Sequence, residues 1–176
     1  ADFIPAAEKY NLMPAVDRWV IEHALERLRS LTVEGRKPTF SINLSGASIA
    51  DERILDYIQN LFSETGVDPS QICFEITETT AIANMSRATS FIRRLKNLGA
   101  TFALDDFGNG FSSFAYLKHL PVDYLKIDGS FVRGIADDPI DYALVQSVNN
   151  IGHVMGMKTI AEYVKDEQIQ TLLEEM

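Results

Sequence analysis

The sequence predicts an α/β fold, an incomplete TIM-type (β/α) barrel with about five parallel strands. Apolar runs of strand length alternate with helical patterns, which is typical of parallel βαβ units. Each unit takes about 30 residues, which suits either an open doubly wound sheet or a barrel. Several expected strands carry an acid, an amide or a lysine at or just after the C-terminal end. This distribution is typical of barrels and favours the barrel over the open sheet.

The first half of the chain begins with a short helical pattern at residues 6–8 and a longer one at about 14–31. Pro14 suits the first turn of the longer helix. The apolar positions that recur there at helical spacing are Val16, Trp19, Val20, Ala24, Leu25 and Leu28. Alternating residues at 39–44 then predict a strand, followed by a turn at Ser45-Gly46.

The same cycle repeats along the rest of the chain. Ile54, Leu55, Ile58, Leu61 and Phe62 share one face of the next expected helix. Gly99 is expected as the C-cap of the helix that follows. The helices are expected at 51–64, 85–98, 140–154 and from 166 onward, and the strands at 72–76, 101–104, 124–127 and 158–161. A complete barrel takes about 250 residues, so we expect the first and last strands to be missing from these 176.

Composition and charge narrow the function classes. A net charge of -9 argues against a nucleic acid polymer as partner, because such binding needs a basic surface. No apolar run is long enough for a membrane segment. Cys73 is the single cysteine and lies in an expected strand, which favours a buried, reduced thiol and a cytoplasmic setting. The chain also suits the cytoplasmic part of a membrane-anchored parent.

The residues that suggest chemistry follow the expected strands, whose C-terminal ends open on one face of a barrel. They are Asn43, Glu75 with Glu78, Asp105 with Asp106, Lys126 and Glu162. Carboxylate and amide oxygens suit Mg²⁺, Mn²⁺ or Ca²⁺, and adjacent aspartates repel each other unless a cation lies between them. Two such ions can clamp a phosphoryl displacement, and Lys126 could hold or deprotonate the attacking water.

Each of these residues also has a purely structural interpretation. Asn43 could bond locally near its turn, and Glu78 could be a helix N-terminal charge. Asp105 and Asp106 could cap the following segment, and Glu162 could be a surface acid. The glycine- and serine-rich loop at 107–113 could close over a substrate or simply connect two elements.

At these residues the chain resembles the EAL domain, a bacterial phosphodiesterase family that opens cyclic di-GMP to linear pGpG. The resemblance covers essentially the whole chain. It rests on ordered motifs, namely Ile42-Asn43-Leu44-Ser45, Phe74-Glu75-Ile76-Thr77-Glu78, Ala103-Leu104-Asp105-Asp106-Phe107-Gly108 with Gly110-Phe111-Ser112-Ser113, Leu120-Pro121-Val122-Asp123-Tyr124-Leu125-Lys126-Ile127-Asp128, and Thr159-Ile160-Ala161-Glu162.

The resemblance implies a role for each matching residue. Asn43, Glu75 and Asp105 would ligate one metal, and Asp105 would bridge to a second beside Asp106. Lys126 would engage the nucleophilic water, and Glu162 would support the second metal. Glu78 would brace the loop after Asp106, and Asp128 would be a further site residue. The implied cofactors are two Mg²⁺ or Mn²⁺ ions.

The chain also departs from the family pattern. The Glu-Ala-Leu strand, which supplies another ligand, should precede Ala1, and a closing strand with a glutamine motif should follow Met176. Residues 162–165 read Glu-Tyr-Val-Lys where Glu-Gly-Val-Glu is frequent, and Asn109 replaces a common threonine. We therefore expect residues 1–176 to be a partial EAL-type domain that is poorly active alone. By resemblance we expect a homodimer and a parent with sensory or GGDEF-type domains.

Two other function classes remain open at this point. A catalytically inactive EAL-type module would bind cyclic di-GMP as a sensor or effector without cutting it. The chain has the acidic residues together with Asn43 and Lys126, which favours the enzyme, since a sensor has less need of every metal ligand. A folded interaction scaffold is the third class, and it would leave the clustered acids unexplained.

Overall fold

The structure is a computed structural model that describes residues 3–35, 37–108 and 114–176. Its strands form a five-stranded sheet in the order β1-β2-β3-β4-β5, and the pairings β1–β2, β3–β4 and β4–β5 are all parallel. The α/β class with five parallel strands is therefore confirmed. The chain forms two compact units, residues 1–76 with 80–102 and residues 77–79 with 103–176.

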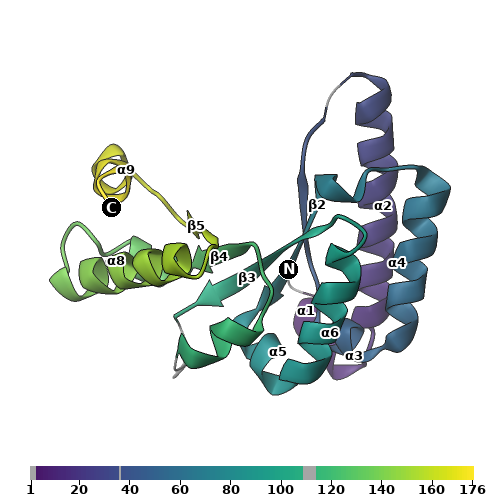
Figure 1. Cartoon of the computed structure of the whole chain (residues 1–176), viewed down its shortest axis with the longest axis horizontal. Helices are drawn as coiled ribbons and strands as arrows, with labels where there is room; N and C mark the ends of the chain where they lie inside the picture. Colours follow the sequence, from purple (N-terminus) through teal and green to yellow (C-terminus); the bar gives the residue numbers. More distant parts are fainter. Residues whose placement is uncertain (1–2, 36, 109–113) are drawn as a thin grey trace. The chain divides into compact units, whose positions relative to one another are not determined.

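The first unit contains most of the helices that the sequence predicts. Its elements are α1 (Ile4–Lys9), α2 (Met13–Val33), β1 (Phe40–Asn43), α3 (Gly46–Ala50), α4 (Glu52–Thr65), the 3₁₀ helix Pro69–Gln71, all but the last residue of β2 (Ile72–Thr77), all but the first two residues of α5 (Glu78–Ala83), α6 (Met85–Lys96) and the first residues of β3 (Thr101–Phe107). The helices α2 and α4 run side by side (Figure 1). Packed rings of Phe74, Phe91 and Phe102 form part of the core, with 5.5 Å between the centroids of Phe74 and Phe102.

Helical periodicity predicts the buried face of α4 fully and that of α2 only in part, because Val16, Val20 and Ala24 are half-buried. All five apolar residues expected on one face of α4 are buried. In α2 the buried residues are Asp17, Ile21, Leu25, Leu28 and Leu31, so Trp19 lies off that face. Trp19 is 59% exposed and stacks on His23 at 4.0 Å between ring centroids. Cys73 is a buried cysteine that is in no disulfide.

Most helix bounds agree with the expectations to within two residues, but the segment after β1 and the C-terminal end of α6 differ in kind. The expected turn at Ser45-Gly46 is instead the start of α3, because the Ser45 hydroxyl accepts a hydrogen bond from Ser48 N and caps a short helix. The helix α6 ends at Lys96 with Asn97 as its C-cap, earlier than expected. Gly99 still closes this end, because its N donates to Lys96 O at 2.9 Å and its φ of 110° turns the chain so that Ala100 N donates to Leu95 O at 3.3 Å.

Asp17 is a buried carboxylate that ties α2 to the segment after β1. The side chain is only 4% exposed. Its Oδ2 accepts hydrogen bonds from Ser45 N at 3.0 Å, Ser45 Oγ at 2.6 Å and Ser48 Oγ at 2.6 Å. Since β1 ends at Asn43, these bonds hold the backbone two residues beyond this candidate ligand.

We expect Asp17→Ala to lower the free energy of unfolding by about 3 kcal/mol, because it leaves three donors without their acceptor. Urea unfolding measures this change. Asp56→Ala is the matched control, because the Asp56 side chain is 74% exposed and lies 3.7 Å from Arg94. The control should change stability by less than about 0.5 kcal/mol. Equal effects of the two variants would contradict the role of Asp17.

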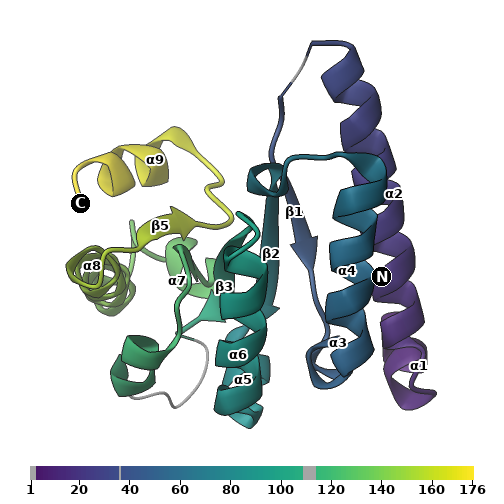
Figure 2. The same ribbon diagram turned by 45° about the vertical axis from the view of Figure 1, so that its right-hand side comes forward.

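The second unit contains the remainder of the parallel sheet. Its elements are most of β3, the 3₁₀ helix Phe114–His119, β4 (Tyr124–Ile127), α7 (Gly129–Val132), α8 (Pro139–Val154), β5 (Lys158–Ala161) and α9 (Glu167–Glu174). The helix α8 packs on β4 and β5, and Figure 2 shows it beside β5. Leu125, Ile127, Val145 and Val148 are buried. Among the residues that the structure describes, no helix is long and apolar enough to cross a bilayer.

Candidate metal centre

A β-bulge in β3 places two acids opposite one lysine. The sequence predicts that this strand ends at residue 104, but β3 continues through Asp105 and Asp106. The register shifts there by one residue, so that both aspartates lie opposite Lys126, and Asp106 has a φ of 55°. A bulge of this kind redirects side chains next to functional sites. The strand pairs on either side of it are Leu104 with Leu125 and Phe107 with Ile127.

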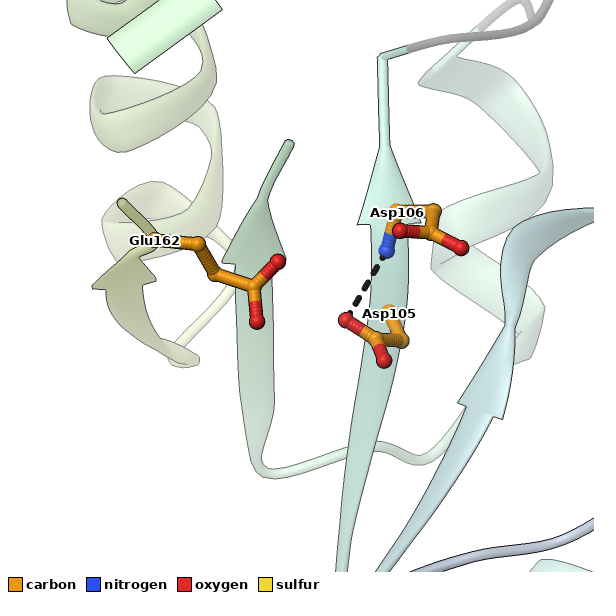
Figure 3. A group of neighbouring side chains, drawn as sticks. All are labelled: Asp105, Asp106 and Glu162. Atoms are coloured by element: carbon orange, nitrogen blue, oxygen red, sulfur yellow. Dashed lines mark hydrogen bonds between the residues drawn. The ribbon is translucent and has the colours of Figure 1, made fainter. Parts of the chain in front are cut away.

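Lys126 joins an acid of β3 to an acid that directly follows β5. Its Nζ lies 2.8 Å from Asp105 Oδ1 and 2.8 Å from Glu162 Oε1. Figure 3 shows the Glu162 side chain reaching from the end of β5 toward the aspartates of β3. One oxygen from each of Asp105, Asp106 and Glu162 lies within 4.8 Å of the others. Three carboxylates thus gather around one ammonium group, so the cluster has an excess of negative charge.

The local field acts on Asp106. Partial desolvation of its carboxyl group, followed by the negative charges of Asp105, Asp128 and Glu162, raises the pKa of Asp106 above its ordinary value of 3.8. The positive charge of Lys126 opposes this shift. Asp106 is solvent-exposed, so solvent screens part of the repulsion. A divalent cation here would relieve the repulsion, because it favours the ionised carboxylates.

This shift has a testable consequence for stability without metal. The folded state binds more protons than the unfolded state between pH 3.8 and the raised pKa of Asp106. The contribution of Asp106 to stability is therefore present below 3.8 and is lost as the pH rises through the raised pKa. In EDTA, we expect Asp106→Asn to gain stability relative to the wild type over this window. Urea unfolding at several pH values measures the difference, and a gain that shrinks with rising pH would contradict the assignment.

Two other predicted site residues of the second unit have defined partners. Asp128 caps α7 by accepting from Ser130 N at 2.7 Å, and its own N donates to Phe107 O at 3.3 Å. Glu78 begins α5 and is only 4% exposed. It accepts from Gly108 N at 3.2 Å and from the Tyr116 hydroxyl at 2.6 Å. Glu78 thus contacts the residue just before 109–113 and the helix just after them. Asn109 and the rest of the glycine- and serine-rich loop, 109–113, lie outside the described residues.

Asn43 and Glu75 lie side by side in the first unit. They are paired in the parallel register of β1 and β2, and Leu44 N donates to Glu75 O at 2.9 Å. Glu75 is buried at 7% exposure, whereas Asn43 is exposed. An amide and a carboxylate from neighbouring strands are hard oxygen donors. That they ligate the same metal as Asp105 stays a prediction.

The donor chemistry of the second-unit cluster fits a divalent cation. Asp105, Asp106 and Glu162 offer only oxygen atoms, which Mg²⁺, Mn²⁺ and Ca²⁺ prefer. A single lysine leaves the cluster with two uncompensated negative charges when all three acids are ionised. Oxygen donors and excess negative charge together make this cluster a candidate metal centre.

Comparison with known proteins identifies the family. The model of the EAL domain matches residues 1–176. The chain belongs to the EAL family.

Curated EAL relatives are much longer than this chain. It is 46% identical over 169 residues to the cyclic di-GMP phosphodiesterase PdeB of Shewanella oneidensis, covering 96% of the chain and 20% of PdeB. It is 34% identical over 173 residues to the bifunctional diguanylate cyclase/cyclic di-GMP phosphodiesterase MucR of Pseudomonas aeruginosa, covering 97% of the chain and 25% of MucR. The chain thus spans about a quarter or less of these relatives.

Solved EAL structures share the fold. The structure of the PaMucR phosphodiesterase in complex with c-di-GMP matches with a TM-score of 0.93 and 32% identity, covering 99% of this chain and 71% of that one. The FimX EAL domain also matches with a TM-score of 0.93, at 26% identity, covering 99% of this chain and 70% of that one. The five-stranded sheet thus corresponds to most of the barrel-like fold of EAL structures.

The sequence-based expectations do not include several residues that contact the candidate site residues or the segments next to them. Asp17 has a detectable signal, because it lies four residues before Ile21 and continues the buried stripe of α2. Tyr116 has no such signal, since nothing in the pattern links it to Glu78. The side-chain contacts of Tyr163 with Gly129 and Arg133 were also unpredicted. Contacts between residues distant in sequence depend on tertiary structure, which periodicity does not encode.

Proposed function

We propose that this chain carries the catalytic residues of a phosphodiesterase that hydrolyses cyclic di-GMP to linear pGpG. The observation that carries the proposal is the convergence of Asp105, Asp106 and Glu162 with Lys126. An oxygen-rich, net negative cluster can act on a phosphodiester only if cations are bound, which favours metal-dependent hydrolysis over metal-free acid–base chemistry. The cyclic di-GMP phosphodiesterase activity of PdeB and the c-di-GMP bound to the PaMucR phosphodiesterase support cyclic di-GMP as the substrate.

We further propose two Mg²⁺ or Mn²⁺ ions as cofactors. Asp105, Asp106 and Glu162 would hold them in the second unit, and the ligand roles of Asn43 and Glu75 belong to the same proposal. Bound divalent cations would neutralise phosphate charge and lower the pKa of water. The protein would contribute fixed oxygen donors, since Lys126 and the bulge of β3 hold Asp105 in place.

In the reaction, the oxygen of water forms a bond to phosphorus while the bond from phosphorus to the 3′ oxygen breaks. The 3′ oxygen takes up a proton, so the ring opens and one 5′ phosphate remains. Lys126, which Asp105 and Glu162 hold at 2.8 Å each, would orient the attacking water. Glu162 would fix Lys126 and support metal binding, and Asp128 would be a further site residue. Glu78 would act indirectly by bracing Gly108 and Tyr116.

The partner domains of the parent protein are part of this proposal. MucR is named as both a diguanylate cyclase and a phosphodiesterase, which supports a parent that also carries a GGDEF-type domain. The expected homodimer stays a prediction.

Incubation of the intact parent with cyclic di-GMP and Mg²⁺ or Mn²⁺, followed by chromatography, tests the function. We expect linear pGpG, which EDTA should abolish. Tight binding without any product would instead identify a sensor module and contradict the enzyme. Residues 1–176 alone should form pGpG slowly or not at all.

A further inference from the structure

Tyr163 has a backbone conformation that its own side chain disfavours. Its φ is 55°, in the left-handed region where glycine is the usual residue. A bulky residue stays in this region only when surrounding contacts hold it there. Tyr163 directly follows Glu162, so whatever holds Tyr163 also constrains the backbone of this member of the acidic cluster.

Two contacts hold the Tyr163 side chain, which is 65% exposed as a residue. The guanidinium carbon of Arg133 lies 4.2 Å from the centroid of the ring. On Gly129, an added Cβ would lie 2.1 Å from Tyr163 Cδ2 and 3.0 Å from Tyr163 Cβ. The tyrosine therefore packs directly on the glycine backbone, and this position has no room for a side chain while the ring stays in place.

These contacts join the two segments that follow β4 and β5. Gly129 comes directly after Asp128, just as Tyr163 comes directly after Glu162. The backbone hydrogen bond at this end of the strand pair, from Glu162 N to Ile127 O, is long at 3.4 Å. Beyond this bond, the packing of Tyr163 on Gly129 keeps the segment after β5 in contact with the start of α7. Figure 2 shows α7 and the segment between β5 and α9.

We propose that Tyr163 is a positioning residue, which fixes the neighbouring Glu162 for metal binding by packing on Gly129 and Arg133. The inference rests on the proposed function of the same site and adds a residue to it. Loss of a residue that orients metal ligands typically weakens metal affinity by about 10–100-fold. Tyr163 and Gly129 should act as one unit, so that disrupting either has the effect of disrupting both.

Mn²⁺ binding to this chain, measured by titration calorimetry, tests the proposal without requiring turnover. We expect Tyr163→Gly to raise the dissociation constant of Mn²⁺ about tenfold, although glycine relieves the positive φ. Tyr163→Phe keeps the ring and should restore the affinity. Gly129→Ala should weaken binding like Tyr163→Gly, and the double variant should be no weaker than either single variant.

Asn11→Gly is the matched control, because Asn11 also has a φ of 55° but lies in the first unit after α1. This substitution should leave the Mn²⁺ dissociation constant within about twofold of wild type. Circular dichroism identifies any variant that fails to fold. If Tyr163→Gly fails to fold, Tyr163→Leu replaces it, and its Mn²⁺ dissociation constant is compared with that of Tyr163→Phe, which keeps the aromatic ring.

The outcomes separate this inference from the proposed function. A Tyr163→Gly protein that folds and binds Mn²⁺ within twofold of wild type overturns the positioning role, even if the parent forms pGpG. Additive effects of Tyr163→Gly and Gly129→Ala also overturn it. Mn²⁺ binding that depends on Tyr163, in a parent that forms no pGpG, supports the inference and contradicts the enzyme. A wild-type chain that binds no Mn²⁺ overturns the positioning role, whereas pGpG formation by the intact parent decides the proposed function separately.

Discussion

Asp105→Asn should lower hydrolysis of cyclic di-GMP by the intact parent by about a thousandfold, equivalent to about 4 kcal/mol of activation free energy. The substitution removes one negative charge from the cluster and replaces one carboxylate oxygen with an amide nitrogen, which cannot ligate a cation. It also weakens the fixation of Lys126, whose Nζ lies 2.8 Å from Asp105 Oδ1. The initial rate of pGpG formation at saturating Mg²⁺ measures this loss.

Asp137→Asn is the matched control for this variant. Asp137 is an exposed aspartate of the same unit and lies outside the metal-ligating group. Its neutralisation should change the rate by less than about twofold. An Asp105→Asn parent that keeps more than a tenth of the wild-type rate would show that Asp105 is not an essential ligand.

Lys126→Met should destabilise the metal-free chain and make its stability depend on divalent cations. Methionine keeps an unbranched side chain but leaves Asp105 and Glu162 without the ammonium group. Removing one partner of a largely buried ion pair should lower the free energy of unfolding by about 2–3 kcal/mol. The loss is expected to be this small because the Glu162 side chain is 25% exposed. Urea unfolding in EDTA should show this loss, and Mn²⁺ should recover more stability in the variant than in the wild type.

Lys165→Met provides the comparison for a lysine outside the cluster. The Lys165 side chain is 52% exposed and lies 4.0 Å from Asp166, so the substitution should change stability by less than about 0.5 kcal/mol. If Lys126→Met were as stable as wild type in EDTA, the repulsion assigned to the acidic cluster would be absent.

Hydrophobic patterning predicts the long elements well, because burial decides them. The strand β4 has the predicted bounds, and the predicted face of α4 is buried. The short helices α3 and α7 escape prediction, since fewer than two turns show no period. Their positions depend instead on capping side chains, Ser45 for α3 and Asp128 for α7.

The sequence predicts which residue types form the site, but it does not predict which residues contact one another there. Acids at strand ends predict a cation site, and the second unit does bring Asp105, Asp106 and Glu162 together. The bulge that sets both aspartates opposite Lys126 was not predicted, because a register shift depends on strand pairing. The left-handed backbone of Tyr163 was also missed, since tyrosine rarely adopts it and the contact with Gly129 is tertiary.

The central claim is that the carboxylates of the second-unit cluster share divalent cations. A crystal structure of this chain grown with Mn²⁺, with anomalous scattering recorded at the manganese edge, tests it most directly. We predict an anomalous peak within coordination distance of Asp105, with Asp106 or Glu162 as a further ligand. Peaks only at other sites, or no peak at saturating Mn²⁺ while Lys126 keeps both ion pairs, would contradict the account.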